Sequence, residues 1–210
     1  MASSEGITTP IIIGITGGIC SGKSKAIQIL SSNFDIIPID ADKLGHECYE
    51  PGTGCMMRIV EAFGEGIVEA GYINRRILGG IVFGDKSKME LLQSIVWPEI
   101  RKKIVTRIAT LSQSGTKAIA LEAAVMIEAK WEDLVTVLWV FQVDPTLAVA
   151  RLMARNSLTL EDADMRVKAQ LSNAERAAYA SVIFENSSDL EKLERDIVSH
   201  GREIGLLPLT

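Results

Sequence analysis

The segment Ile11-Ile-Ile-Gly-Ile-Thr-Gly-Gly-Ile-Cys-Ser-Gly-Lys-Ser24 holds the strongest structural signal in this 210-residue chain. It begins with an apolar, mostly β-branched run, which is typical of a buried strand. Residues 17–24 then match G-x-x-x-x-G-K-[ST], the pattern of a glycine-rich loop whose backbone N–H groups surround phosphates. A helical pattern follows from Lys23 to about Asn33, and a helix N-terminus favours a bound anion. The segment therefore predicts a strand, a phosphate-binding loop and a helix, in that order.

The residues of this loop have expected parts in holding a nucleoside triphosphate. Lys23 is expected to reach the β- and γ-phosphates, and the Ser24 hydroxyl is expected to coordinate Mg²⁺. The expected nucleotide-binding residues of this region are Gly17, Gly18, Ile19, Cys20, Ser21, Gly22, Lys23, Ser24 and Lys25. The alternative is a glycine-rich turn with a surface lysine, which the rarity of the full pattern makes the weaker interpretation.

Further apolar runs of strand length alternate with helical patterns along the chain. This alternation is typical of an α/β fold with a parallel sheet flanked by helices. The expected strands span 11–16, 35–40, 117–122, 134–144 and 181–184. Residues 53–115 show helical patterns without a convincing strand, which indicates a helical insertion, and Pro98 is expected to open one of its helices.

Composition limits the class of protein. With 47% apolar and 23% charged residues, the chain has ordinary globular composition. Its net charge of −5 argues against a general nucleic-acid binder, which needs a basic face. The longest apolar run, 134–143, is about ten residues and too short to span a bilayer. Met1 to Gly6 lack the features of a signal peptide, and three cysteines without a C-x-x-C pair favour a reducing compartment, so we expect a cytoplasmic protein.

Acidic residues at 40 and 42 end the second expected strand, in the sequence Asp40-Ala-Asp42. Ligands of α/β proteins bind at this edge of the sheet, and a carboxylate there could accept the proton of an acceptor hydroxyl, as kinases require. The alternative is that Asp42 only caps the next helix, since Asp is a favoured N-cap. Arg151 and Arg155 are four residues apart and share one face of the helix expected from Pro145.

Taken in order, these segments resemble the dephospho-coenzyme A kinase family of P-loop kinases, from about Ile11 to Leu193. Besides the loop, the similar segments are 39–42, 73–78, 82–83, 97–100, 122–128 with Trp131, 151–155, 166–170 and 182–186. The resemblance implies transfer of the γ-phosphoryl group of ATP to the ribose 3′-hydroxyl of dephospho-CoA, with Mg²⁺ as cofactor. It also implies a nucleotide-binding core (11–52, 116–150 and 181–210), a coenzyme-binding helical insertion (53–115) and a helical lid (151–180).

The same resemblance implies roles for single residues. Asp42 is similar to the base that takes the hydroxyl proton, and the expected catalytic residues are Asp42, Lys23 and Arg151. The other implied contacts are Arg75, Arg76, Glu122 and Arg166 with the substrate, Arg155 and Asn186 with ATP, and Arg176 in the lid. Cys20, Trp97 and Glu122 depart from the common pattern, which has Gly, His and Asp there. The Trp97-Pro pair and the stretch 123–127 resemble eukaryotic members more than bacterial ones.

Two other functions stay open on the sequence alone. The same loop and base would serve a kinase of another small hydroxyl substrate, such as a nucleoside or nucleotide. The loop would also serve a nucleotide-dependent switch ATPase, although the basic lid-like segment and the long insertion argue against that. In each case we expect a small-molecule partner, no nucleic acid and no stable membrane insertion.

Overall fold

The computed structural model describes residues 9–187 and 189–209, and the chain divides into two compact units. Unit 1 comprises the residues up to Ile39 and from Ile108 onward, and unit 2 spans Asp40–Arg107. Met1 to Gly6, where we expect no signal peptide, lie outside the described residues. Within the described ranges, no helix has both the length and the apolar character needed to cross a bilayer.

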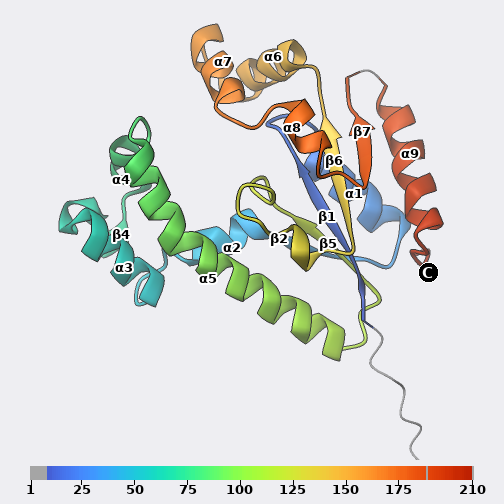
Figure 1. The fold of residues 1–210 in the computed structure, drawn as a ribbon, viewed down its shortest axis with the longest axis horizontal. Helices are drawn as coiled ribbons and strands as arrows, with labels where there is room; N and C mark the ends of the chain where they lie inside the picture. The colour runs from blue at the N-terminus through green and yellow to red at the C-terminus, as the bar shows by residue number, and fades with distance from the viewer. Residues whose placement is uncertain (1–8, 188, 210) are drawn as a thin grey trace, which may run out of the picture. The chain divides into compact units, whose positions relative to one another are not determined.

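Unit 1 is built on a five-stranded sheet with the order β2-β5-β1-β6-β7 (Figure 1). The strands are β1 (Ile11–Gly17), β2 (Ile37–Asp40), β5 (Ala118–Glu122), β6 (Val137–Gln142) and β7 (Val182–Glu185). β1 pairs in parallel with both β5 and β6, and β6 pairs in parallel with β7. The expected α/β fold with a parallel sheet is confirmed. Each of the five expected runs contains a strand, and β1 and β7 each end one residue later than expected.

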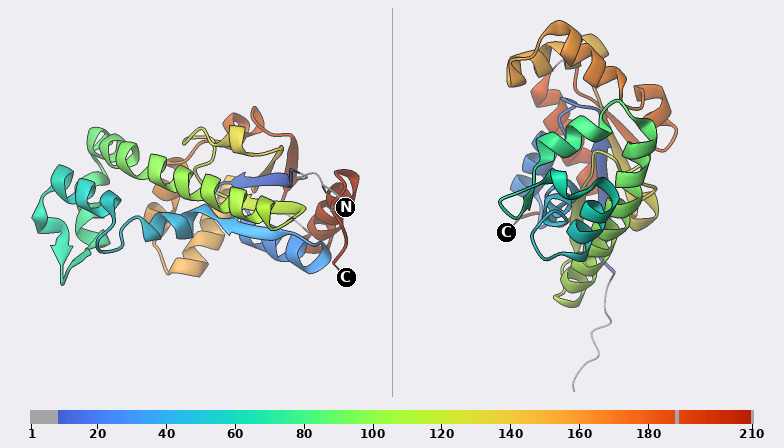
Figure 2. Two further views of the ribbon diagram at one scale, coloured as in Figure 1. Left: turned by 90° about the horizontal axis from the view of Figure 1, so that it is seen from below. Right: turned by 90° about the vertical axis from the view of Figure 1, so that its left-hand side faces the viewer.

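Helices of unit 1 connect and cover these strands. They are α1 (Lys23–Asn33), α6 (Pro145–Asn156), α7 (Leu160–Lys168), α8 (Asn173–Ala177) and α9 (Leu190–Glu203), with a 3₁₀ turn at Glu132–Leu134. α1 packs against α9, and α6 packs against α7, as Figure 2 also shows for the second pair. The predicted helix after the phosphate-binding loop has the bounds that we expect from the sequence.

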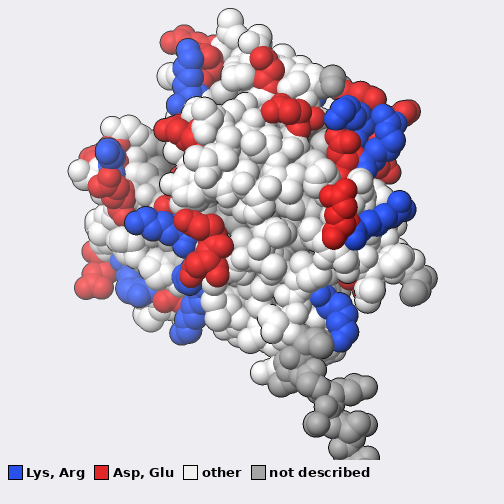
Figure 3. Space-filling model, turned by 45° about the vertical axis from the view of Figure 1, so that its right-hand side comes forward, with Lys and Arg blue, Asp and Glu red and all other residues white. Residues whose placement is uncertain are grey.

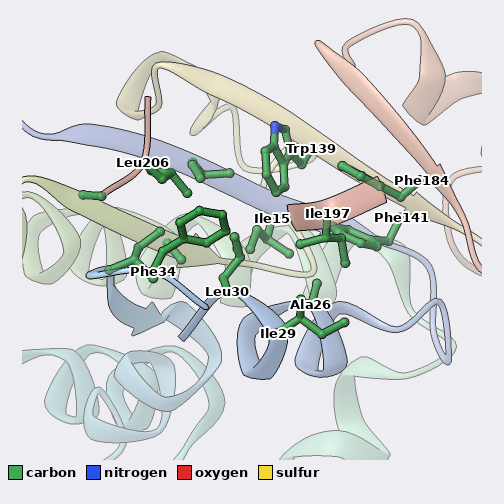
Figure 4. Close-up of a cluster of buried hydrophobic side chains, with 14 of the residues drawn as sticks. Ile15, Ala26, Ile29, Leu30, Phe34, Trp139, Phe141, Phe184, Ile197 and Leu206 are labelled. Carbon is green, nitrogen blue, oxygen red and sulfur yellow. The ribbon is translucent and has the colours of Figure 1, made fainter. Parts of the chain in front are cut away.

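A buried hydrophobic core of unit 1 lies between the sheet and the helices α1 and α9 (Figure 4). Ile15 of the central strand is fully buried, and Leu30 and Ile197 meet it from the two helices. The rings of Phe141 and Phe184 stack with their centroids 4.9 Å apart. Burying each such side chain stabilises the fold by about 1.5–3 kcal/mol, so the core fixes the end of β1 from which the loop emerges.

Unit 2 consists mainly of helices. They are α2 (Ala41–Glu47), α3 (Gly54–Phe63), α4 (Arg75–Val82) and most of α5 (Lys86–Gln113), whose last residues belong to unit 1. A 3₁₀ turn spans Glu65–Ile67. The unit begins at Asp40 and ends at Arg107, whereas we expect an insertion over 53–115. The coenzyme-binding role of this segment stays a prediction.

A short hairpin in unit 2 lies where we expect no strand. β3 (Val68–Glu69) and β4 (Tyr72–Ile73) form an antiparallel pair. The turn residues Ala70 and Gly71 have φ values of 50° and 83°, as a two-residue hairpin turn with the right twist requires. Two-residue strands contain too little alternation for recognition in a sequence, which explains the error.

Helix α5 runs without a break through Pro98, so the expectation that Pro98 opens a helix is wrong. A proline inside a helix costs about 3 kcal/mol because it removes one hydrogen bond and crowds the preceding turn. Leu92, Val96, Ile100 and Ile104 are buried and repeat every four residues on both sides of the proline. Burial of this continuous apolar stripe outweighs the local cost.

Candidate active site

The loop 17–24 joins the end of β1 to the start of α1, and its backbone requires glycine at two positions. Gly17 and Gly22 have φ values of 152° and 102°. A Cβ atom on Gly17 would lie 2.2 Å from the carbonyl oxygen of Phe141. One on Gly22 would lie 2.3 Å from Nδ2 of Asn186. Both the dihedral angle and the close packing therefore exclude a side chain at these positions of the motif.

The N-terminus of α1 opens into this loop. Gly22 is its N-cap residue, no side chain caps the helix, and no acidic residue lies in the first turn. The N–H groups and the positive end of the helix dipole therefore favour an anion at this end. Cys20 has a φ of 59°, which costs a non-glycine residue roughly 1 kcal/mol. This dihedral angle explains why the common pattern has glycine at position 20.

Lys23 and Ser24 come from the first turn of α1. Nζ of Lys23 donates to the carbonyl oxygens of Gly17 and Gly18, at 3.0 Å each, so the ammonium group lies over the loop. Oγ of Ser24 donates to Oε1 of Glu122, at the end of β5, over 3.3 Å. A hydroxyl and a carboxylate side by side are oxygen ligands of the kind that Mg²⁺ prefers.

The chemistry of these donors fits Mg²⁺ better than a transition metal. In the ranges that the structure describes, no group of three or more His, Cys, Asp or Glu side chains could hold a metal ion. Mg²⁺ often needs only one or two protein oxygens, because substrate phosphates and water complete its octahedron. Ser24 and Glu122 are therefore the residues that fit it.

Two further side chains bond the loop from distant parts of the sequence. Nη1 of Arg151, on α6, donates to the carbonyl oxygen of Cys20 over 3.3 Å. Nδ2 of Asn186, just after β7, donates to the carbonyl oxygen of Ser21 over 2.9 Å. The structure thus brings these two expected site residues to the loop.

Other expected site residues are not brought to the loop. Arg155 is exposed, and its Nε donates to Oδ1 of Asn156 over 2.8 Å. Arg166 is exposed on α7, and the structure records no hydrogen bond or ion pair between it and another described residue. Lys25 is half-buried in the first turn of α1. Ligand contacts of these three residues stay predictions.

Sequence reasoning missed the contact of Gln170 with the loop. The backbone N–H of Ile19 donates to Oε1 of Gln170 over 2.8 Å, although the two residues are 151 positions apart. The arginine expected in an exposed lid, Arg176, is instead only 3% exposed. Burial lowers its pKa, while the charge of Glu128 acts in the opposite direction. No local pattern in the sequence indicates the hydrogen bond of Gln170 or the burial of Arg176.

A cavity of about 270 Å³ lies beside the loop, on the side of α7 and α8. Gly18 and Ile19 of the loop form part of its wall. The polar side chains of Gln170 and Arg176 line it together with apolar groups such as Val167. The first half of the loop therefore borders this cavity.

The expected base, Asp42, belongs to unit 2 and is exposed in the first turn of α2. The N-cap of this helix is Asp40, whose carboxylate accepts the N–H of Lys43 over 3.0 Å. The alternative that Asp42 caps the helix is therefore wrong.

The two arginines expected to bind the substrate open helix α4 of unit 2. Both are exposed, and the guanidinium of Arg75 lies over the ring of Tyr49, with Cζ 5.9 Å from the ring centroid. The N–H of Arg76 donates to Oδ1 of Asn74, the N-cap of the helix, over 3.0 Å. This places two cations on adjacent residues at the start of one helix.

Comparison with known proteins gives one consistent family. The sequence profile of the dephospho-CoA kinase family matches residues 11–192. A dephospho-CoA kinase of Geobacter sulfurreducens is 43% identical over 187 residues, covering 89% of this chain and 94% of that protein. One of Carboxydothermus hydrogenoformans is 38% identical over 190 residues, covering 90% and 91%. Both are bacterial, so the expected likeness to eukaryotic members is not confirmed.

Solved structures agree with these relatives. The crystal structure of TT1252 from Thermus thermophilus superposes with a TM-score of 0.80 at 30% identity, covering 94% of this chain and 99% of that one. A dephospho-CoA kinase from Campylobacter jejuni gives a TM-score of 0.68 at 27% identity, covering 92% and 96%. The similarity therefore extends over nearly the whole chain.

Proposed function

This chain belongs to the dephospho-CoA kinase family, and from this premise we propose that it transfers the γ-phosphoryl group of ATP to the ribose 3′-hydroxyl of dephospho-CoA. The product is CoA. The observation that carries the proposal is the loop between β1 and α1, whose glycines, helix N-terminus and Lys23 ammonium group fit the phosphates of a nucleotide.

ATP is held mainly by the loop in this proposal. The backbone N–H groups of 17–24 and Nζ of Lys23 bind the phosphates, which neutralises charge as it develops on the transferred group. Ser24 and Glu122 hold Mg²⁺, which supplies further charge neutralisation at the phosphates when it is bound. Asn186, whose Nδ2 is bonded to the loop, contacts the adenine in this proposal.

Asp42 acts on the acceptor. Its carboxylate takes the proton of the ribose 3′-hydroxyl as the oxygen attacks the γ-phosphorus, and the oxygen bridging to ADP leaves with its electron pair. Arg75 and Arg76 bind anionic groups of dephospho-CoA, because they are exposed cations side by side. Residues 53–115 form the coenzyme-binding part in this proposal.

The lid supplies further cations. Arg151, Arg155 and Arg166 lie on α6 and α7, and the guanidinium of Arg151 already reaches the loop. Closure of a basic segment over the phosphates stabilises transferred charge and excludes water. Residues 151–180 serve as this lid in the proposal.

The proposed partners are small molecules, and the proposed location is the cytoplasm. All three cysteines are free, which fits a reducing compartment. Lys and Arg side chains are interspersed with Asp and Glu on the face that Figure 3 draws, and this mixture of signs supports a protein without a nucleic-acid partner.

The test is product identification with the purified protein. Incubation with ATP, Mg²⁺ and dephospho-CoA should give CoA by mass, and omission of Mg²⁺ should abolish it. Matched reactions replace dephospho-CoA with nucleosides or nucleotides, or contain no acceptor. Faster transfer to a nucleoside would favour the alternative kinase, and ATP hydrolysis without acceptor at the rate of transfer would favour a switch ATPase.

A further inference from the structure

The peptide between Gly18 and Ile19 connects two side chains. Its carbonyl oxygen accepts a hydrogen bond from Nζ of Lys23 at 3.0 Å. Its N–H donates to Oε1 of Gln170 at 2.8 Å. Because a peptide unit is planar and rigid, fixing its N–H also fixes the direction of its carbonyl group. The orientation of this one peptide therefore links Gln170 to the Lys23 ammonium group.

Arg176 bonds the chain next to Gln170. The guanidinium Nη1 donates to the carbonyl oxygen of Leu171, the residue after Gln170. A Cβ atom on Gly18 would lie 3.4 Å from Nη1 of Arg176 and 3.6 Å from Oε1 of Gln170, so both side chains cover the same face of the loop. Arg176 is 3% exposed, and its Nε has no hydrogen-bond partner among the described residues.

Helix α8, which carries Arg176, is hydrogen-bonded to the end of a strand of the sheet. Nε2 of Gln142, at the end of β6, donates to the carbonyl oxygen of Asn173 over 2.9 Å. Nδ2 of Asn173 donates in return to the carbonyl oxygen of Val143, also over 2.9 Å. Ser172 and Glu175 form a reciprocal capping box at its start. The support for Gln170 thus rests on the core of unit 1.

We propose that Gln170 is a positioning residue for phosphoryl transfer, which acts on Lys23 through the Gly18–Ile19 peptide and is held in turn by Arg176. This inference rests on the proposed kinase function. A neutral amide suits the role, because its oxygen accepts the Ile19 N–H without placing a negative charge next to the phosphates. The carbonyl oxygen of Gly18 also accepts the N–H of Ser21 over 3.2 Å. Loss of the Gln170 bond therefore removes one of two anchors of this peptide, and the carbonyl of Gly18 tilts away from the ammonium group.

The test compares Gln170→Met, which keeps the length and loses the acceptor, with Gln170→Glu, which keeps the acceptor. We expect Gln170→Met to lower kcat about 10- to 100-fold, the range that misplacement of a catalytic group produces. The KM for dephospho-CoA and the Tm should stay close to those of the wild type. Gln28→Met makes the same change at an exposed position of α1, and as the matched control it should leave kcat unchanged.

Gln170→Glu separates positioning from charge. Its activity relative to the wild type should rise as the pH falls from 7 to 4.5, because a glutamate, with an ordinary pKa of about 4.3, is then partly protonated and becomes a neutral acceptor at the Ile19 N–H. A relative activity of Gln170→Glu that does not change with pH would contradict this explanation. A merely structural role of Gln170 would not produce such a pH profile.

A double-mutant cycle with Lys23→Ala decides whether Gln170 acts through Lys23. If it does, Gln170→Met should cause little further loss in the Lys23→Ala background. Equal losses in both backgrounds, or a wild-type kcat for Gln170→Met, would overturn the inference. If Gln170→Met does not fold, the same cycle is measured with Gln170→Ala, which also lacks the acceptor. Wild-type protein that makes no CoA would instead refute the proposed function.

Discussion

The three glycines of the phosphate-binding loop, at positions 17, 18 and 22, differ in whether a side chain would fit. Gly17 and Gly22 have positive φ, and a Cβ on either would meet other atoms at 2.2–2.3 Å. Gly18 has ordinary dihedral angles, and a Cβ there would make contacts of 3.4 Å or more. Position 18 therefore tolerates a small side chain, while positions 17 and 22 do not.

Lys23→Ala removes the ammonium group that lies over the loop. We expect kcat to fall by at least about 10²-fold, the scale of losing one preorganised electrostatic donor. Circular dichroism should stay unchanged, because the side chain of Lys23 is not part of the buried core of unit 1. Lys192→Ala, which removes an exposed lysine on α9, is the control. Near wild-type turnover of Lys23→Ala would refute the assigned phosphate role.

The cysteine in the loop should react faster than the two cysteines of unit 2. Burial raises the pKa of Cys48 to about 12 and also raises the pKa of Cys55, so both thiols stay protonated at pH 8. Cys20 is half-buried in the loop. Iodoacetamide at pH 8 should therefore alkylate Cys20 first, and ATP with Mg²⁺ should protect it, as peptide mass spectrometry would show. Equal labelling of Cys48, or no protection by ATP, would contradict this.

Helix packing in unit 1 depends on a glycine in α9. A Cβ on Gly201 would lie 2.6 Å and 2.7 Å from ring atoms of the buried Phe34. We expect Gly201→Ala to lower the free energy of unfolding by about 1–3 kcal/mol, the usual cost of overpacking a core. Gly80→Ala, in α4 with no atom within 4 Å, should instead raise it by about 0.5–1 kcal/mol. Urea titration of both variants measures the contrast, and equal effects would refute the packing argument.

The lid should move in α7 and not in α8. Reciprocal bonds of Asn173 with β6 hold α8, whereas Arg166 on α7 is exposed. Hydrogen exchange with dephospho-CoA and a non-transferable ATP analogue should show new protection in 160–168 as arginine–phosphate contacts form. Exchange in 173–177 should stay slow with or without ligands. Equal changes in both helices, or none in α7, would place the moving part elsewhere.

At the scale of elements, the sequence predicts a segment well where residues close together in the chain determine its structure. The strand, loop and helix over 11–33 could be predicted because glycine, lysine and β-branched residues act within a few positions. The hairpin at 68–73 could not, because its strands are too short to show alternation. Pro98 predicts the start of a helix, but the buried stripe on α5 outweighs this local preference. The bond of Gln170 to Ile19 depends on tertiary structure, so no spacing in the sequence encodes it.

At the scale of the whole molecule, the proposed base, Asp42, belongs to unit 2. Asp42→Asn should lower kcat by about 10²–10⁴-fold, because the amide cannot take the hydroxyl proton. The affinity for ATP and the Tm should barely change, since the ATP contacts proposed for Lys23 lie in unit 1 and Asp40 is the residue that caps α2.

The matched variant for this prediction is Asp40→Ala. It removes the side chain that accepts the N–H of Lys43, so it should lower stability by about 1 kcal/mol. Calorimetric Tm and ATP titration, measured together with kcat for both variants, separate the two carboxylates. A large loss of Tm in Asp42→Asn with a normal kcat would reverse their assigned roles.

The order of strands in the sheet also bears on how the chain is made. β1 lies between β5 and β6, and Ile11 pairs with Ala118, so the first strand to leave the ribosome has no neighbour until much later. Unit 2 is contiguous in sequence and complete at Arg107, before either partner of β1 has been synthesised. We therefore expect unit 2 to become compact during translation. The apolar segment of β1 should stay unpaired and accessible to chaperones until β5 and β6 have been synthesised.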